Sequence, residues 1–249
     1  MTPEEFNAST SGPLQKLGAL HYFHPYAKEA AESLGIDGFR FYFCGRAGVL
    51  GEVSTDVMLS AFGYFEPGLV DKMWTTGKER CNVVEAAHAQ LNVAYRIGAD
   101  ALGEVDGLGE AAEAMAQLTA QVDRSSLPLF AGFVALDPPA APAEAFMHQA
   151  IVMRELRGSV HLAALAATGL SSRAAHQIKR PNDLEMFGYK EAIDISDADR
   201  AAYELVEPMT NGAMNLHAEA ITSAQRAQVA QVSTDAMAAF ADEIEKLGV

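Results

Sequence analysis

The fold of the C-terminal third is decided by the stretch SDADRAAYELVEPMTNG, which runs from Ser196 to Gly212. Its first four residues, Ser-Asp-Ala-Asp, are typical of a helix N-terminus, because short polar side chains accept hydrogen bonds from free backbone N–H groups. Pro208 predicts the end of this helix near Val206, since proline has no N–H to donate. The following Thr-Asn-Gly triplet at residues 210–212 is typical of a turn.

Helical segments flank this stretch on both sides. Ser171-Ser172 favours a helix start, and Pro181 ends that short helix after Ile178. Residues 222–247 predict one long terminal helix with a hydrophobic stripe formed by Val229, Val232, Met237, Phe240 and Ile244. The order of helix, short turn, helix, turn-rich hairpin and terminal helix predicts a degenerate winged-helix-like C-terminal half.

The rest of the chain is rich in alanine and sparse in β-branched residues, which favours short helices over sheets. One proline-rich segment, Asp137-Pro-Pro-Ala-Ala-Pro142, interrupts the helical periodicity. We therefore expect a mostly α protein with a helical, aromatic-rich domain over residues 1–137 and a winged-helix-like domain with a long C-terminal helix over residues 142–249. The amphipathic helix after Pro142 is expected to bend or end at Gly158.

Charge and composition indicate which classes of partner and which cellular compartment to expect. The 249 residues carry 33 acidic and 18 basic side chains, a formal net charge of −15. Phosphates would be repelled by such a chain, so nucleic acid is expected to be an unlikely partner and an anionic membrane surface is not expected. Residues 1–13 do not resemble a signal peptide, no apolar run reaches the ~20 residues that span a bilayer, and only two cysteines are present. A cytoplasmic protein is the simplest interpretation.

Five segments resemble the actinobacterial SalK-like helix-turn-helix family, whose function is unsettled. They are YFHP at residues 22–25, GRAGVLG at 45–51, FGYFEP at 62–67, RGSVHLAAL at 157–165 and STD at 233–235. The resemblance covers nearly the whole chain. It implies a mostly helical fold with a winged-helix-like C-terminal half, and it implies no known reaction.

The helix expected to enter a DNA groove has the wrong charge for that role. A single Arg200 is surrounded by five acids: Asp194, Asp197, Asp199, Glu204 and Glu207. The expected wing at residues 209–219 contains no Lys or Arg. A small basic cluster on the preceding helix, formed by Arg173, His176, Lys179 and Arg180, is interpreted as a solvated face. We therefore expect the winged-helix portion to be a scaffold or a dimer interface.

Two residues are the first candidates for catalysis. His161 lies in an apolar element, where an imidazole can move a proton near neutral pH, although a core histidine with a backbone partner is the structural alternative. Arg46 follows an aromatic run and can hold an anion, whereas its structural alternative is a buried ion pair with one of the many acids. Tyr42 completes the candidate catalytic set as a hydrogen-bonding group.

The aromatic residues of the N-terminal half are the candidate wall of a ligand pocket. The candidate ligand-binding residues are Tyr22, His21, His24, Phe43, Phe62, Phe65 and Arg157. The spacing of His21 and His24 would place both rings on one helix face, but no further ligand motif accompanies them, so no metal is predicted. The glycines of the segment 45–51 lack a phosphate-binding pattern, and no cofactor is predicted.

Three functions remain open at this point. The preferred hypothesis is a protein that binds a small aromatic or apolar molecule and that, if it is an enzyme, is a cofactor-independent lyase or isomerase. The first alternative is a ligand-responsive helix-turn-helix transcriptional regulator. The second is a non-catalytic binding or dimerisation module, and the stripe of the terminal helix favours a homodimer.

Overall fold

The computed structural model describes residues 1–247, which form helices and no strand. The mostly α fold class predicted from sequence is confirmed. The elements in chain order are α1 (Pro3–Leu17), α2 (Leu20–Phe23), α3 (Pro25–Ser33), α4 (Gly38–Ala47), the 3-10 turn η1 (Gly48–Leu50), α5 (Thr55–Phe62), α6 (Pro67–Lys78), α7 (Val83–Ala101), α8 (Leu108–Ala120), α9 (Pro128–Val134), α10 (Pro142–Thr168), α11 (Ser172–Lys179), α12 (Asp197–Ala218), α13 (Ser223–Ala239) and α14 (Ala241–Leu247). None of these helices is long and apolar enough to cross a membrane.

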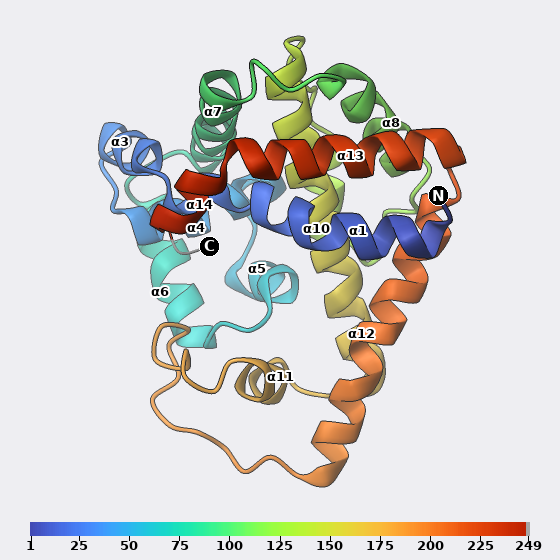
Figure 1. Cartoon of the computed structure of the whole chain (residues 1–249). Coiled ribbons are helices and arrows are strands. Elements are labelled where there is room, and N and C mark those ends of the chain that lie inside the picture. Colours follow the sequence, from blue (N-terminus) through green and yellow to red (C-terminus); the bar gives the residue numbers. More distant parts are fainter. Residues whose placement is uncertain (248–249) are drawn as a thin grey trace.

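Helix α10 is the axis of the molecule. Its upper part lies among α1, α7 and α8, and its lower end passes into a lobe formed with α11 and the first half of α12 (Figure 1). It remains a continuous helix of 27 residues. The predicted bend or end at Gly158 is wrong, because neighbouring helices bury the residues on both sides of it, from Phe146 to Leu165.

Two separate groups of buried side chains hold the fold together. The large group, here called the body core, extends from Phe6 in α1 to Phe240 after α13. The small group, here called the lobe core, consists of six buried residues, Ala164, Leu165, Leu170, Ala174, Ala175 and Val206. Residues before and after the segment 137–142 both contribute to the body core. This core does not separate two domains at that segment, and the domain boundary stays a prediction.

Helix α12 differs from the prediction that opened the sequence analysis. It begins where expected, because the Ser196 hydroxyl accepts a hydrogen bond from the Asp199 amide, but it continues through Pro208 to Ala218. The predicted helix end and the turn at residues 210–212 are therefore wrong. The buried residues Val206, Thr210, Met214 and Ala218 recur every four positions. Their burial on one helix face compensates for the hydrogen bond that Pro208 cannot donate.

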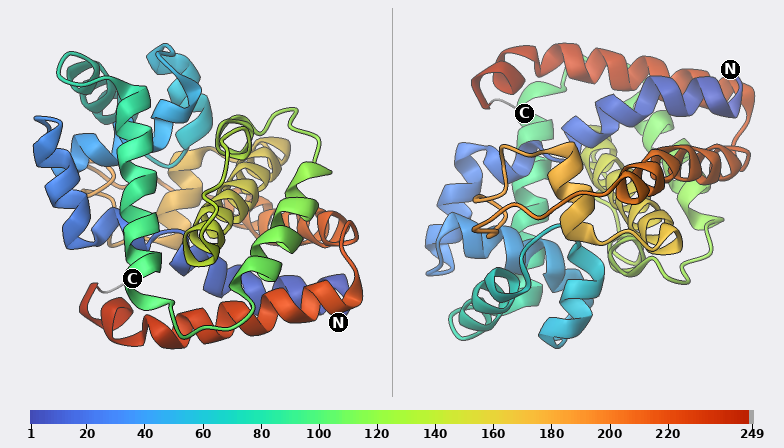
Figure 2. Two further views of the ribbon diagram at one scale, coloured as in Figure 1. Left: turned by 90° about the horizontal axis from the view of Figure 1, so that it is seen from above. Right: turned by 90° about the horizontal axis from the view of Figure 1, so that it is seen from below.

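The terminal helix is interrupted. Phe240 lies between α13 and α14 and is fully buried. Helix α13 runs alongside α1 and also packs on α8, as the views from above and below show (Figure 2). The stripe residues Val229 and Val232 are buried in the body core of the same chain. The hydrophobic surplus from which a homodimer was predicted is thus covered within one chain.

Candidate functional site

Arg46 lies in a buried ion pair with Glu155 of α10. Its Nε donates to Glu155 Oε1 over 3.0 Å and its Nη2 donates to Oε2 over 2.8 Å, so the contact is bidentate. Its Nη1 donates to the Tyr42 hydroxyl over 3.2 Å. The structure therefore places Arg46 beside Tyr42, and the Glu155 carboxylate already occupies one edge of the guanidinium. The catalytic role of both residues stays a prediction.

A second guanidinium shares the same carboxylate. Arg154 Nη1 donates to Glu155 Oε1 over 2.5 Å, and Tyr22 OH lies 3.4 Å from both atoms. Burial by itself would raise the pKa of Glu155, but the neighbouring Arg46 and Arg154 outweigh this and lower it. The Glu155 side chain is 1 % exposed, Arg46 is buried and Arg154 is partly buried, so the carboxylate is held away from water between two cations. We call these residues, with His21, the Arg46 cluster.

His21 borders this cluster as a neutral imidazole. Burial, helped by the charge of Arg154, lowers its pKa to about 3. Its Nδ1 has no hydrogen-bond partner among the described residues. His24 lies elsewhere, because Pro25 begins a new helix and His24 Nδ1 accepts a hydrogen bond from the Tyr26 amide at its N-terminus. No group of three His, Cys, Asp or Glu side chains within residues 1–247 is placed to hold a metal ion.

The predicted aromatic wall is a packed layer. Phe43 stacks on Phe62 with ring centroids 5.4 Å apart, and the ring of Phe65 lies 5.0 Å from that of Phe43. The Arg46 guanidinium lies 4.8 Å from the centre of the Phe62 ring, a cation–π contact. None of these rings lines either hollow described below. Their role in ligand binding stays a prediction.

His161 belongs to a different cluster, here called the His161 cluster. Its Nε2 lies 2.5 Å from the Tyr64 hydroxyl and its Nδ1 lies 3.3 Å from Thr210 Oγ1. The Thr210 proton is donated to the Val206 carbonyl, so Thr210 accepts from Nδ1–H and the Tyr64 hydroxyl donates to Nε2. Burial lowers the pKa of His161, with a further contribution from Lys179. The imidazole links α10 to α12 and to the turn after α5.

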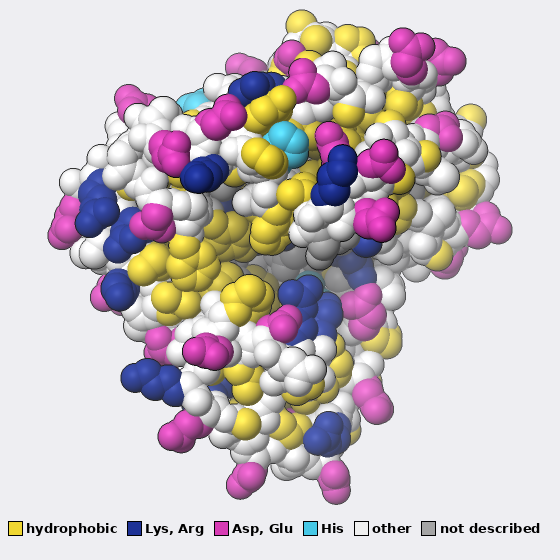
Figure 3. Space-filling view, turned by 60° about the vertical axis from the view of Figure 1, so that its left-hand side comes forward, with side chains coloured by type: hydrophobic (Ala, Val, Ile, Leu, Met, Phe, Trp, Pro, Cys, Tyr) yellow, Lys and Arg dark blue, Asp and Glu magenta, His cyan; other side chains and the backbone are white. Residues whose placement is uncertain are grey.

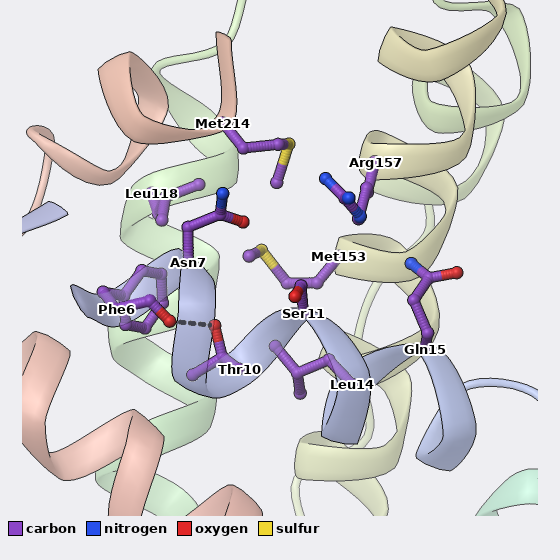
Figure 4. A pocket seen from close by; sticks show the side chains of 10 residues that line it. All are labelled: Phe6, Asn7, Thr10, Ser11, Leu14, Gln15, Leu118, Met153, Arg157 and Met214. Carbon is purple, nitrogen blue, oxygen red and sulfur yellow. Dashed lines mark hydrogen bonds between the residues drawn. The ribbon is translucent and has the colours of Figure 1, made fainter. Parts of the chain in front are cut away.

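Arg157 also joins α10 to α12. Its Nη2 forms a short ion pair with Glu207, whose other oxygen lies 3.8 Å from His161 Nδ1. Arg157 borders a hollow between α1, α10 and α12 into which Asn7, Met153 and Met214 point (Figure 4). Its volume is about 10 Å³, which is room for one water molecule. The two candidate catalytic residues Arg46 and His161 thus belong to separate clusters, one around Glu155 and one further along α10.

At its lower end, α10 is joined to α11 by a short turn. The helix ends at Thr168, and the three residues Gly169-Leu170-Ser171 lead directly into α11. Gly169 has φ +72°, a conformation that glycine adopts without strain, and Ser171 Oγ accepts from the Ala174 amide over 3.1 Å. Leu170 turns into the lobe core. Two helices joined by a short turn that contains glycine form a helix-turn-helix unit.

Helix α11 differs in charge from the rest of the lobe. Residues 171–181 include Arg173, Lys179 and Arg180 and no acid. Lys179 and Arg180 are exposed, and Lys and Arg side chains lie among acidic ones on the lower part of the molecule (Figure 3). His176, by contrast, is buried against the ring of Phe187 at 4.1 Å.

The segment after α11 folds back along one flank of that helix. Gln177 exchanges two hydrogen bonds with the backbone of Ile193, at 2.7 and 2.8 Å, and Arg173 Nη2 donates to the Glu191 carbonyl over 2.8 Å. These contacts fix the orientation of α11 on the lobe. They leave the cations at its C-terminal end uncovered.

Several partners of the predicted residues were missed in the sequence analysis. Glu155 and Arg154 precede the recognised motif at 157–165 and carry no local signal of their own. Thr210 was assigned to a turn, which hid its place on a buried helix face opposite His161. Only the tyrosine of FGYFEP, Tyr64, was in a segment already singled out.

Comparison with known proteins identifies a family and no individual relative. No curated protein and no solved structure matches the chain. A family model described as a helix-turn-helix family matches residues 8–248. Members of such a family are expected to bind DNA, so the prediction that nucleic acid is an unlikely partner is wrong. That prediction weighed the acids of the segment 194–207, whereas the helix behind the Gly169 turn, α11, has none. Because the match covers nearly the whole chain, the protein belongs to a helix-turn-helix family.

Proposed function

We propose that the protein is a cytoplasmic, SalK-like, ligand-responsive transcriptional regulator that binds DNA through α11. The observation that carries this proposal is the unit α10–Gly169–α11, in which a basic helix without acids follows a three-residue turn. In helix-turn-helix proteins the second helix enters the major groove. Helix α11 holds that place in this chain.

The distribution of charge supports this assignment although the net charge is −15. Contacts with phosphate are local, because salt screens charges beyond a Debye length of ~8 Å. Lys179 and Arg180 are solvent-exposed. Arg180 Nη1 lies 4.0 Å from the Asp183 carboxylate, an exposed ion pair of small energy that a phosphate can replace. The acidic remainder of the chain weakens nonspecific attraction to DNA, so binding is expected to be strongly salt-dependent and selective for sequence.

The acids at the start of α12 have a structural role that does not oppose this function. The Asp199 carboxylate accepts hydrogen bonds from Ser196 N and Ser196 Oγ, at 2.9 and 2.6 Å. Together with Asp197 it lies in the first turn of α12, where negative charge is stabilised by the helix dipole. These carboxylates stabilise the end of a helix that we do not place in the groove.

The lyase or isomerase hypothesis has less support. Arg46 is neutralised by Glu155, and both ring nitrogens of His161 have partners. A general base must reach a substrate proton, and neither residue lines the hollow that Arg157 borders or the recess beside Ser159.

The proposal is tested with DNA selected by the protein from genomic fragments, followed by fluorescence anisotropy over a series of salt concentrations. We expect the double variant Lys179→Ala/Arg180→Ala to lose roughly 10- to 100-fold in affinity and to reduce the salt slope by about two. The matched control is Lys28→Ala/Lys72→Ala, which removes two exposed cations from α3 and α6. An equal loss in the control, or no selective binding by the natural chain at physiological salt, would contradict the proposal.

A further inference from the structure

A recess lies on the side of α10 just above the lobe. It is bounded by the end of α5, the approach to α9 and the middle of α10. Its volume is about 170 Å³. The lining side chains are small or apolar, and none is charged: Ser60, Ala61, Ser126, Pro128, Ser159, Leu162, Ala163 and Ala166. Ser60, Ser126 and Ala166 are exposed, so the recess opens to solvent.

One buried hydroxyl in this recess has a free donor. Ser159 is 6 % exposed, and its Oγ accepts from the Phe130 amide over 3.4 Å. Within residues 1–247 this hydroxyl donates no hydrogen bond, so its proton remains for a ligand in the recess. A ligand that supplies an acceptor to this hydroxyl would gain one hydrogen bond in the recess.

Size and charge restrict what the recess can hold. An apolar cavity of ~150 Å³ accepts a molecule as large as benzene. A charged ligand would lose its hydration without gaining an opposite charge from the eight lining residues. The chemistry therefore fits a neutral single-ring or short-chain molecule with one carbonyl or similar acceptor.

Leu162 connects the recess to the helix-turn-helix lobe. It lines the recess and also packs against the lobe core. Its Cδ2 lies 2.5 Å from the position that a Cβ on Gly63 would occupy, so no room remains on that side. A molecule that displaces Leu162 must therefore shift its neighbours in the lobe core, Ala164 and Leu165 among them.

We infer that this recess is an effector site for a small neutral carbonyl compound, whose binding to Ser159 and Leu162 changes the orientation of the lobe. The binding site itself follows from the recess. The effect on DNA rests on the proposed function.

The test uses acetophenone and toluene as probes, with binding measured by calorimetry and by methyl NMR of the full chain. We expect saturable binding of both probes. Ser159→Ala should weaken acetophenone about three- to tenfold, the loss of one hydrogen bond, and leave toluene unchanged. Ala163→Leu fills the recess and should weaken both probes at least about tenfold. Its matched control, Ala167→Leu, adds the same side chain at an exposed position one helical turn away.

The outcomes separate this inference from the proposed function. If acetophenone binds and changes the DNA affinity of the natural chain at least about twofold, and if Ala163→Leu abolishes that change, the inference is supported. Probe binding without any DNA binding overturns the proposed function and leaves the recess as a ligand site. The inference is overturned if neither probe binds saturably, or if Ala167→Leu weakens binding as much as Ala163→Leu does.

Discussion

The body and the lobe bury polar groups in opposite ways. In the body, Arg46, Arg154 and Glu155 are enclosed and bonded to one another. In the lobe, six small or medium apolar residues form the core, and the cations of α11 stay at the surface. The body thus depends on a buried charged network, whereas the lobe combines a small apolar core with hydrogen bonds from Arg173 and Gln177 to its own backbone.

This difference indicates which region of the molecule is free to bind a partner. A buried ion network fixes side chains in one arrangement and leaves them no freedom to bind a partner. A small apolar core tolerates a shift of one helix against another and keeps its charges free. We therefore expect substitutions in the Arg46 cluster to act on stability and substitutions in the lobe to act on DNA binding.

The largest expected effect is that of Glu155→Gln. It leaves the buried guanidinium of Arg46 and the partly buried guanidinium of Arg154 without a negative partner, so we expect the free energy of unfolding to fall by about 3 to 5 kcal/mol. Urea denaturation followed by circular dichroism measures the change. Glu32→Gln serves as the control, because Glu32 is 67 % exposed in its pair with Lys28 and should change stability by less than about 0.5 kcal/mol. A loss below about 1 kcal/mol in Glu155→Gln would show that the fold does not depend on the carboxylate that Arg46 and Arg154 share.

Sequence alone predicted the arginine of this network but not its partner. Arg46 stands beside an aromatic run, and a buried ion pair was one of its two interpretations. Glu155 lies 109 positions away in the chain and is one of 33 acids, so no local pattern identifies it. Which acid meets Arg46 is decided by the packing of both α4 and α10 on α7, a tertiary arrangement that periodicity does not specify.

The second effect is a dependence of stability on pH through His21. The pKa of this residue falls to about 3 in the folded chain, so between that value and the ordinary ~6.5 the unfolded chain binds the additional proton. The contribution of neutral His21 to the free energy of unfolding is therefore complete above pH 6.5 and is lost as the pH falls below that value. We expect His21→Gln to reduce the loss of unfolding free energy between pH 7 and pH 5 by about 2 kcal/mol, measured by denaturation at both values.

Tyr22→Phe is the matched control for His21→Gln. It alters the same cluster, and burial raises the pKa of the Tyr22 phenol, away from the range between pH 5 and 7. The control should therefore keep the pH dependence of the natural chain. If His21→Gln also keeps it, the histidine is not buried in its neutral form and the body is more open than described.

The helix starts at Ser171 and Ser196 and the helix end before Pro181 were predicted well, whereas Gly158 and Pro208 were wrongly predicted to interrupt a helix. Ser171 and Ser196 each accept from the amide three residues further on, so the sequence shows the whole interaction. Pro208 and Gly158 weaken a helix only by an amount that distant packing can exceed, and the body supplies that packing around α10 and α12. The same limitation concealed the His161 cluster, because Thr210 faces His161 only if α12 continues past Pro208.

The smallest expected effects are those of alanine substitutions at two glycines, one within α10 and one directly after it. The two substitutions should change the free energy of unfolding in opposite directions. Gly169 has φ +72°, so Gly169→Ala should destabilise the chain by about 1 to 2 kcal/mol. Gly158 lies within α10 with no atom near its missing Cβ, so Gly158→Ala should stabilise by about 0.5 to 1 kcal/mol. Thermal unfolding measures both changes, and hydrogen exchange locates them. Faster exchange in α11 than in α1 for Gly169→Ala would show that the lobe opens on its own, whereas uniform acceleration would mean that body and lobe unfold as one unit.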